Sequence, residues 1–249
     1  MSANQSPLAE SIRRILMAIA FLAASITTLS AEILPVKTYT TADGLLRDTA
    51  NCIKQDSRGF LWFCPSDGLS RFDGYGFVSY TTEDGLPHRS ITDFLETRDG
   101  VYWVATRDGL ARFNPKGKRG AEVGNEPRFT AFKPADNNEA REISVLFEDS
   151  RSVLWCGTAD GLYKIETTDK QVVFHRIELR KDRSSVPLTV SSIIEDRRGN
   201  IWIGMDLDQG LNRVTPDGRV EHFRTERGKA KNESITTLFE TKDGEIWAV

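Results

Sequence analysis

Three cysteines are the residues of this sequence whose chemistry depends most directly on their spacing. Cys52 and Cys64 flank a turn at residues 56–59, and counting outward from that turn places them nearly opposite each other on adjacent strands. They lie within reach of a disulfide if both side chains face the same way. The alternative is that position 64 only requires a small residue, since three later segments hold Ala or Gly there. Cys156 stands alone beside Trp155 and is expected to be buried.

Other residues that could bind a metal or catalyse a reaction do not form a recognisable set. Asp206 and Asp208 alternate as in a calcium loop, but a third acid and a distant Glu are missing, and Asp is common in turns. His88, His175 and His222 lie at no metal-ligand spacing. No Gly-x-Ser-x-Gly, His-Glu-x-x-His or phosphate-binding glycine loop is present. We therefore expect no metal, no cofactor and no enzymatic activity in this chain.

All five tryptophans occupy the same place in an internal repeat. They are Trp62, Trp103, Trp155, Trp202 and Trp247, spaced 41, 52, 47 and 45 residues apart. A Gly stands three residues before each, except in the third copy, where Ser152 predicts a longer or distorted turn. A Gly-Leu pair follows each of the first four. A period of this length indicates a repeat architecture.

Each period is predicted to hold four short strands. In the fourth copy the expected strands are 190–195, 200–204, 211–214 and 220–224, with turns at 196–199 and 215–218. Four antiparallel strands in about 40–45 residues form the blade of a β-propeller. No segment after Leu29 shows sustained helical spacing of apolar residues. The sequence therefore predicts an all-β fold, a β-propeller of four-stranded antiparallel blades.

The predicted propeller occupies residues 32–249 and holds about four and a half blades. Residues 36–45 repeat the sequence of 78–86, so residues 36–40 are expected to be an outer closing strand. The blades are expected at 46–81, 87–133, 140–178 and 188–224, with the start of a fifth at 233–249. An incomplete ring leaves strand edges unpaired. We interpret the sequence as a truncated part of a longer propeller.

The first 31 residues are predicted to be a signal peptide. Arg13 and Arg14 precede an apolar run from Ile15 to Leu29, followed by small residues. The run is shorter than the roughly 20 residues of a membrane span, although an uncleaved anchor is the alternative. We expect export to the periplasm or to the extracellular face of a bacterial envelope. The net charge of −3 gives no reason to expect nucleic acid as a partner.

Four strings carry a resemblance to a known family. They are residues 56–62 (DSRGFLW), 67–75 (DGLSRFDGY), 97–103 (TRDGVYW) and 195–204 (EDRRGNIWIG). These resemble the two-component regulator propeller repeat. The resemblance implies an extracytoplasmic sensor region that precedes a β-sandwich-like module, a membrane helix and a signalling output, often a histidine kinase. It also implies a closed ring of about seven blades.

Recognition is expected on the loops at one side of the blades. These loops join the last strand of one blade to the next blade (41–49, 81–90, 134–142, 178–189 and 225–234) or the second strand to the third (65–68, 106–109, 158–161 and 205–210). They vary while the strands repeat, and function commonly resides on such loops. We predict ligand contacts from His88, Arg89, Arg107 and Asp160.

The function that these features favour is ligand sensing by a two-component signal transduction receptor. The expected partners are a small-molecule or glycan ligand, the remaining blades, and a membrane-anchored signalling module. One alternative is a freestanding secreted propeller that binds a protein or a glycan. The weaker alternative is a propeller hydrolase or lyase, whose catalytic residues would come from several blades and would therefore show no local motif.

Overall fold

The computed structural model describes residues 14, 16–17, 36–119, 126–134, 137–168, 171–179, 188–206, 210–223 and 234–249. The chain divides into two compact units, Met1–Thr38 and Tyr39–Val249, and the fold reported below is that of the second. Almost all of the predicted signal segment, residues 1–31, lies outside the described residues. Within the described ranges, no helix has the length and apolar character that crossing a membrane requires.

Four sheets of four antiparallel strands, followed by a hairpin, make up the second unit. In each sheet the strands are ordered as in the sequence. We call the sheets blades 1 to 4 and the hairpin blade 5. Blade 1 consists of β1 (Ile53–Gln55), β2 (Leu61–Phe63), β3 (Leu69–Phe72) and β4 (Phe77–Tyr80). Blade 2 consists of β5 (Ile91–Glu96), β6 (Tyr102–Thr106), β7 (Gly109–Phe113) and β8 (Phe129–Phe132).

The later blades repeat this plan. Blade 3 consists of β9 (Ile143–Glu148), β10 (Leu154–Thr158), β11 (Gly161–Thr167) and β12 (Val172–Ile177). Blade 4 consists of β13 (Val190–Glu195), β14 (Ile201–Met205), β15 (Leu211–Val214) and β16 (Val220–Phe223), and blade 5 of β17 (Leu238–Glu240) and β18 (Ile246–Ala248). The short helical segments are η1 (Thr41–Asp43), η2 (Thr82–Asp84) and α2 (Asn138–Arg141). The all-β prediction is confirmed, and each blade lies within its predicted range.

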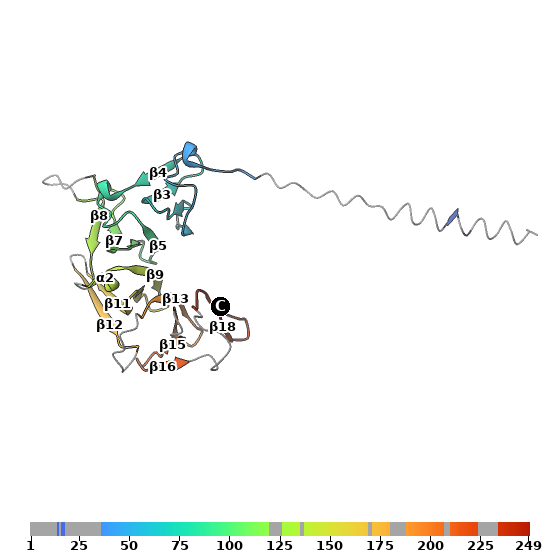
Figure 1. Ribbon diagram of the computed structural model, residues 1–249, viewed down its shortest axis with the longest axis vertical. Coiled ribbons are helices and arrows are strands. Elements are labelled where there is room, and N and C mark those ends of the chain that lie inside the picture. The colour runs from blue at the N-terminus through green and yellow to red at the C-terminus, as the bar shows by residue number, and fades with distance from the viewer. Residues whose placement is uncertain are drawn as a thin grey trace, which may run out of the picture. The chain divides into compact units, whose positions relative to one another are not determined.

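The blades follow one another along an arc, and the ring is not closed within the described residues (Figure 1). The first strands of blades 2 to 5 contact each other in succession. Side chains in these first strands, and Asn51 just before β1, donate hydrogen bonds to the backbone of the next blade. The donor–acceptor pairs are Asn51 Nδ2 to Ile91 O (3.1 Å), Thr92 Oγ1 to Ile143 O (2.6 Å), Ser144 Oγ to Val190 O, and Ser191 Oγ to Ile235 O.

The repeated Trp lies on the second strand of each blade and packs against the blade that follows. The ring of Trp62 is fully buried and stacks on Phe94 of blade 2, with 4.6 Å between ring centroids. Trp103, Trp155 and Trp202 are likewise buried in clusters that include residues of the next blade. Trp247 of blade 5 is 59% exposed. A single blade therefore cannot bury its own Trp, and neighbouring blades supply that stability.

The turn between the first and second strands is built around one carboxylate. In blade 1, Asp56 accepts hydrogen bonds from the backbone N–H of Arg58 (3.0 Å) and Phe60 (2.9 Å) and from Nε1 of Trp62 (3.0 Å). Asp149 holds Trp155 and Asp196 holds Trp202 in the same way, at 3.1 and 2.8 Å. Blades 2 and 5 have a Thr at this position.

The turn that contains Ser152 has the same form as the others, so the predicted distortion is wrong. Ser152 adopts a φ of 59°, in the left-handed region, and its N–H donates to Asp149 O at 3.0 Å, as Gly59 N–H does to Asp56 O. This conformation costs a non-glycine residue roughly 1 kcal/mol of conformational free energy. The hydrogen bonds to the Asp149 carboxylate hold the turn in its usual shape despite that cost.

Residues 36–40 form no strand in the structure. The predicted closing strand would pair with the last blade of a complete ring, so it stays a prediction. A strand exists only with a hydrogen-bonded partner, and the described residues supply none here. Instead Thr40 begins η1, where its N–H donates to the Asp43 carboxylate at 2.8 Å. The same capping pattern recurs at η2, and Gly44 and Gly85 follow with φ of 100° and 104°. The internal sequence repeat therefore includes a repeated helical cap, which follows strand β4 in the second copy and no described strand in the first.

Candidate functional site

The loops predicted to form the recognition surface are linked by ion pairs between neighbouring blades. We call this side the loop face, defined by residues 41–49, 65–68, 81–90, 106–109, 137–142 and 158–161. Asp67, in the second loop of blade 1, pairs with Arg47 and also lies 3.7 Å from Arg89. Three loops thus meet at one carboxylate. The loops at 178–189, 205–210 and 225–234 lie wholly or partly outside the described residues.

A second group of charges joins blades 2 and 3. Arg107 lies 3.4 Å from the Glu142 carboxylate, and the Glu142 carbonyl accepts from the N–H of Ala159 at 3.1 Å. The neighbouring Asp108 accepts from Lys133 at 2.7 Å. On the loop face, opposite charges therefore cross the boundary between blades 1 and 2 and the boundary between blades 2 and 3.

Asp160 is bound within its own blade. It accepts from the Tyr163 hydroxyl at 2.9 Å and from Arg176 Nη2 at 3.2 Å. Burial of Tyr163, together with its hydrogen bond to Asp160, raises the pKa of that phenol above its ordinary value. Asp160 therefore fixes Tyr163 and Arg176 at the end of blade 3.

The four predicted ligand residues do not meet in one cavity. His88 accepts from the N–H of Ser90 at 3.0 Å and shapes its own loop. Arg89 and Arg107 are 72% and 59% exposed in their side chains and cross blade boundaries, whereas Asp160 stays within blade 3. No contact among the described side chains joins these four to one another. They mark separate places along the loop face.

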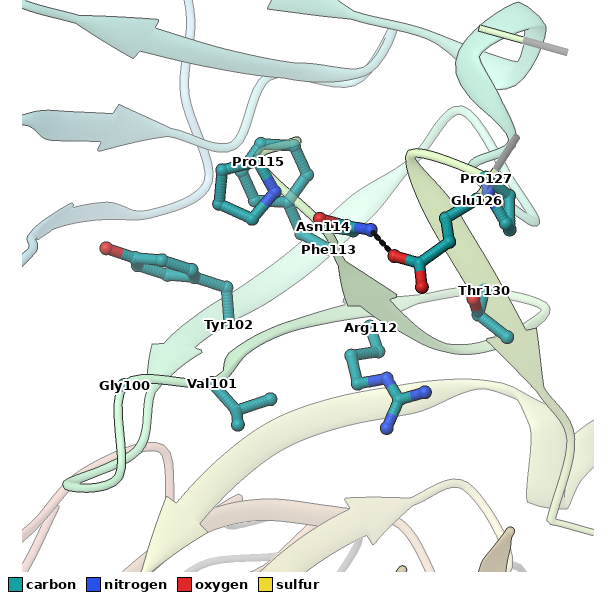
Figure 2. A pocket seen from close by; sticks show the side chains of 10 residues that line it. All are labelled: Gly100, Val101, Tyr102, Arg112, Phe113, Asn114, Pro115, Glu126, Pro127 and Thr130. Atoms are coloured by element: carbon teal, nitrogen blue, oxygen red, sulfur yellow. Dashed lines mark hydrogen bonds between the residues drawn. The ribbon is translucent and has the colours of Figure 1, made fainter. Parts of the chain in front are cut away.

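The opposite side, which we call the turn face, holds the turns after the first and third strands. A hollow of about 460 Å³ opens there on blade 2. Figure 2 shows the Asn114 amide donating to Glu126 across it, at 2.8 Å, with Tyr102 and Arg112 also at its wall. None of the four predicted ligand residues lines this hollow.

The turn face also carries a repeated contact that sequence reasoning missed. The second residue of each turn donates its backbone N–H to a Glu that ends the first strand of the next blade. The pairs are Ser57 with Glu96 (2.6 Å), Arg98 with Glu148 (2.9 Å), Ser150 with Glu195 (2.6 Å) and Arg197 with Glu240 (3.2 Å). The signal was present, because a Glu or Gln precedes the turn in all five copies. We call this contact the turn latch.

The cysteines differ in their state. Cys52 and Cys64 lie opposite each other, with Cα atoms 5.1 Å apart and the N–H of Cys64 donating to Cys52 O, and the structure joins them by a disulfide. Cys156 is a free, fully buried thiol, as predicted, and its burial raises its pKa. Position 64 also matches a crowded place in the repeat. A side chain added at Gly204, which is equivalent, would meet Ser192 and Ile235 of blades 4 and 5.

Metal ligands are not clustered in the part of the chain that the structure describes. No group of three or more His, Cys, Asp or Glu residues there is placed to hold an ion. Asp208 lies outside the described residues, so the Asp206–Asp208 pair is not seen as a whole.

Two segments, residues 85–108 and 185–206, match the family described as two component regulator propeller. The first begins at the end of η2 and runs through the first two strands of blade 2, and the second covers the equivalent part of blade 4. A segment of 64 residues is 34% identical to histidine kinase P4 of Formosa agariphila. The aligned segment covers 24% of this chain and 5% of that protein.

Solved structures share the fold. The extracellular domain of a hybrid two component system of B. thetaiotaomicron aligns with a TM-score of 0.65 and 18% identity, over 86% of this chain and 27% of its own. A second such domain of B. thetaiotaomicron aligns with a TM-score of 0.59 and 21% identity, over 76% of this chain and 24% of its own. Virginiamycin B lyase of Staphylococcus aureus aligns with a TM-score of 0.58 and 14% identity, over 79% of this chain and 61% of its own. Identities this low show likeness of fold alone.

The chain spans about a quarter of the length of the two extracellular domains it resembles. The matched segments contain the first hairpins of blades 2 and 4, each with the Gly and the Trp of the repeat. The resemblance seen in the sequence is thereby confirmed: residues 85–108 and 185–206 match the two-component regulator propeller repeat, within a β-propeller fold of four-stranded blades.

Proposed function

We propose that this chain is an extracytoplasmic ligand-sensing propeller region of a two-component signal transduction receptor. The observation that carries the proposal is the loop face, where ion pairs join blade 1 to blade 2 and blade 2 to blade 3 on a scaffold that includes regulator propeller repeats. On this proposal the chain binds a ligand and performs no catalysis itself.

The chemistry of the loop face suits a polyhydroxylated or anionic ligand. Arg89 and Arg107 each present several N–H donors, and both are mostly exposed. Their carboxylate partners, Asp67 and Glu142, belong to neighbouring loops. A ligand that replaces one of these partners changes a contact between two blades. Binding is thereby coupled to the relative position of the blades, which gives a signal a physical route through the propeller.

The proposal is tested on the receptor that contains this chain. Loops 81–90 and 106–109 are exchanged for the equivalent loops of another blade, and output is measured with and without a panel of glycans. We expect the response to be lost while circular dichroism stays unchanged. Exchange of the turns at 56–59 and 97–100 is the matched control. Loss of response from the control exchange alone would place recognition on the turn face and overturn the proposal.

The proposed location outside the cytoplasm has its own test. Residues 1–40 are fused to alkaline phosphatase, which is active only after export. Activity from the fusion, and its loss when Arg13 and Arg14 and the apolar run after them are deleted, is the expected result. An inactive fusion that accumulates in the cytoplasm would contradict export.

A further inference from the structure

Three of the four complete blades fill the boundary beside their Trp with the same two groups. Strand register places a basic residue of the third strand opposite the Trp, as with Trp62 and Arg71. It also places an aromatic residue of the fourth strand opposite the Leu of the Gly-Leu pair. These aromatics are Tyr80, Phe132 and Phe223, and their ring centroids lie 6.1, 6.1 and 5.3 Å from that of the Trp. The Arg adds a cation–π contact to this layer.

That contact is present in each of the three blades. The guanidinium carbon lies 4.5 Å from the Phe60 centroid for Arg71, 5.8 Å from Phe132 for Arg112, and 5.1 Å from Trp202 for Arg213. A flat cation and a ring thus occupy the space next to the Trp.

Blade 3 departs from this pattern at both positions. Lys164 stands opposite Trp155, and Ile177 stands at the place of the aromatic residue. Both side chains are narrower than the groups they replace. A cavity of about 310 Å³ lies between blades 3 and 4, and Lys164, Ile177 and Trp155 line it. Lys164 and Ile177 thus line the cavity at the places where the other three complete blades carry an Arg and an aromatic ring. A hollow of about 560 Å³ also lies beside Trp202, where Arg213 and Phe223 are present but the described part of blade 5 is a two-stranded hairpin.

The walls and the mouth of this cavity differ in chemistry. Val153, Ile201, Val214 and Pro216 add apolar surface to that of Trp155 and Ile177. Its two charged lining residues are both basic, Arg151 and Lys164.

The nearby carboxylates are already engaged. Asp149 accepts from Trp155 Nε1 and from two backbone N–H groups and lies 3.4 Å from Arg151, and Glu195 is held by Ser150. Lys164 is exposed, and its side-chain amine forms no hydrogen bond or ion pair with the described residues. An amine without a partner at the edge of an apolar cavity complements an anion.

We propose that the cavity between blades 3 and 4 binds a planar aromatic anion. Its ring lies beside Trp155 in the space that Phe132 and Phe223 fill in blades 2 and 4. Its anionic group meets Lys164 and Arg151. This site is separate from the loop face and does not depend on the sensing function proposed above.

The test uses 2-naphthoate and its uncharged analogue 2-naphthamide as probes, with binding to the whole chain measured by ligand-observed NMR. The wild-type chain is expected to bind both, and the carboxylate more tightly. I177F restores the ring found in blades 2 and 4 and is expected to abolish binding of both probes. K164Q is expected to lower the affinity for 2-naphthoate about tenfold, the contribution of one charge-assisted hydrogen bond. The affinity for 2-naphthamide should stay unchanged. K116Q removes an exposed charge elsewhere and is expected to change neither.

Each result decides the proposal. Absence of binding to the wild-type chain overturns it, as does full binding by I177F with an unchanged circular dichroism spectrum. If I177F fails to fold, K164Q decides alone. If K164Q lowers the affinity for both probes equally, or if K116Q lowers the affinity for 2-naphthoate as much as K164Q does, the charge at this cavity is not what recognises the anion.

Discussion

At the scale of single residues, the Asp that begins the turn does more than end a strand. Burial alone would raise the pKa of Asp56, but hydrogen bonds from the Trp62 indole and from the backbone of Phe60 and Arg58 outweigh it, so its pKa lies below the ordinary value. Asp196 is shifted in the same direction, where burial is outweighed by Asn200 and Trp202. These carboxylates therefore stabilise the fold in their charged form.

That direction predicts how stability depends on pH. The pKa of Asp56 in the folded state lies below the reference value of 3.8, so its contribution is complete above that value and is lost as the pH falls through the folded-state pKa. We expect D56N to lower the free energy of unfolding by about 1–3 kcal/mol at pH 7. The difference from wild type should shrink below about pH 4, as followed by urea unfolding at several pH values. A difference that stays constant with pH would contradict this role of the carboxylate.

The cysteines allow a second prediction at this scale. The native chain should show no thiol that reacts with Ellman's reagent, because Cys156 is fully buried and its pKa is raised. Unfolding without a reductant should expose one thiol, and unfolding with a reductant removed before the assay should expose three. C156S is the control and should remove one thiol from both counts. Three thiols in the unreduced, unfolded chain would show that Cys52 and Cys64 are not bonded.

At the scale of the elements, the sequence indicated most of what the structure contains. Trp recurs at one place in every copy, and the turn before it uses a Gly in four copies and an Asp in three, so the hairpins could be read from the pattern. The regular turn at Ser152 could not be predicted, because it depends on hydrogen bonds to the Asp149 carboxylate that hold the turn in shape. The conformation of residues 36–40 could not be predicted either, because a strand there depends on a partner strand. Which charges pair on the loop face depends on which loops lie next to each other in the fold. The local sequence pattern does not indicate those neighbours.

The second strand carries a requirement for small residues that is testable. Gly204 faces Ser192 and the backbone of Ile235, so a methyl group there would push blade 4 from blade 5. We expect G204A to lower the free energy of unfolding by about 1–3 kcal/mol, the usual effect of overpacking. Gly76 has open space around it and no left-handed φ, so G76A should change stability far less. Equal effects of the two variants in chemical unfolding would contradict the crowding at Gly204.

At the scale of the whole molecule, blade 5 exposes side chains that the other blades bury. Phe239 and Trp247 are 63% and 59% exposed. Apolar residues gathered on a sheet favour association. We expect the chain to self-associate with rising concentration in size-exclusion chromatography with light scattering, and the double variant F239T/W247Q to do so less. V78T removes another partly exposed apolar residue in blade 1 and serves as the control. A monodisperse monomer at all concentrations would contradict this expectation.

The turn latch gives the arc a direction. Each blade donates backbone N–H groups from its turn to the blade after it and accepts, through its own Glu, from the blade before it. The two sides of a blade boundary are therefore not interchangeable. The earlier blade always supplies the N–H groups and the later blade always supplies the carboxylate. A blade placed in reversed order would bring two donor turns or two carboxylates together, so the latch specifies the order of the blades as well as their spacing.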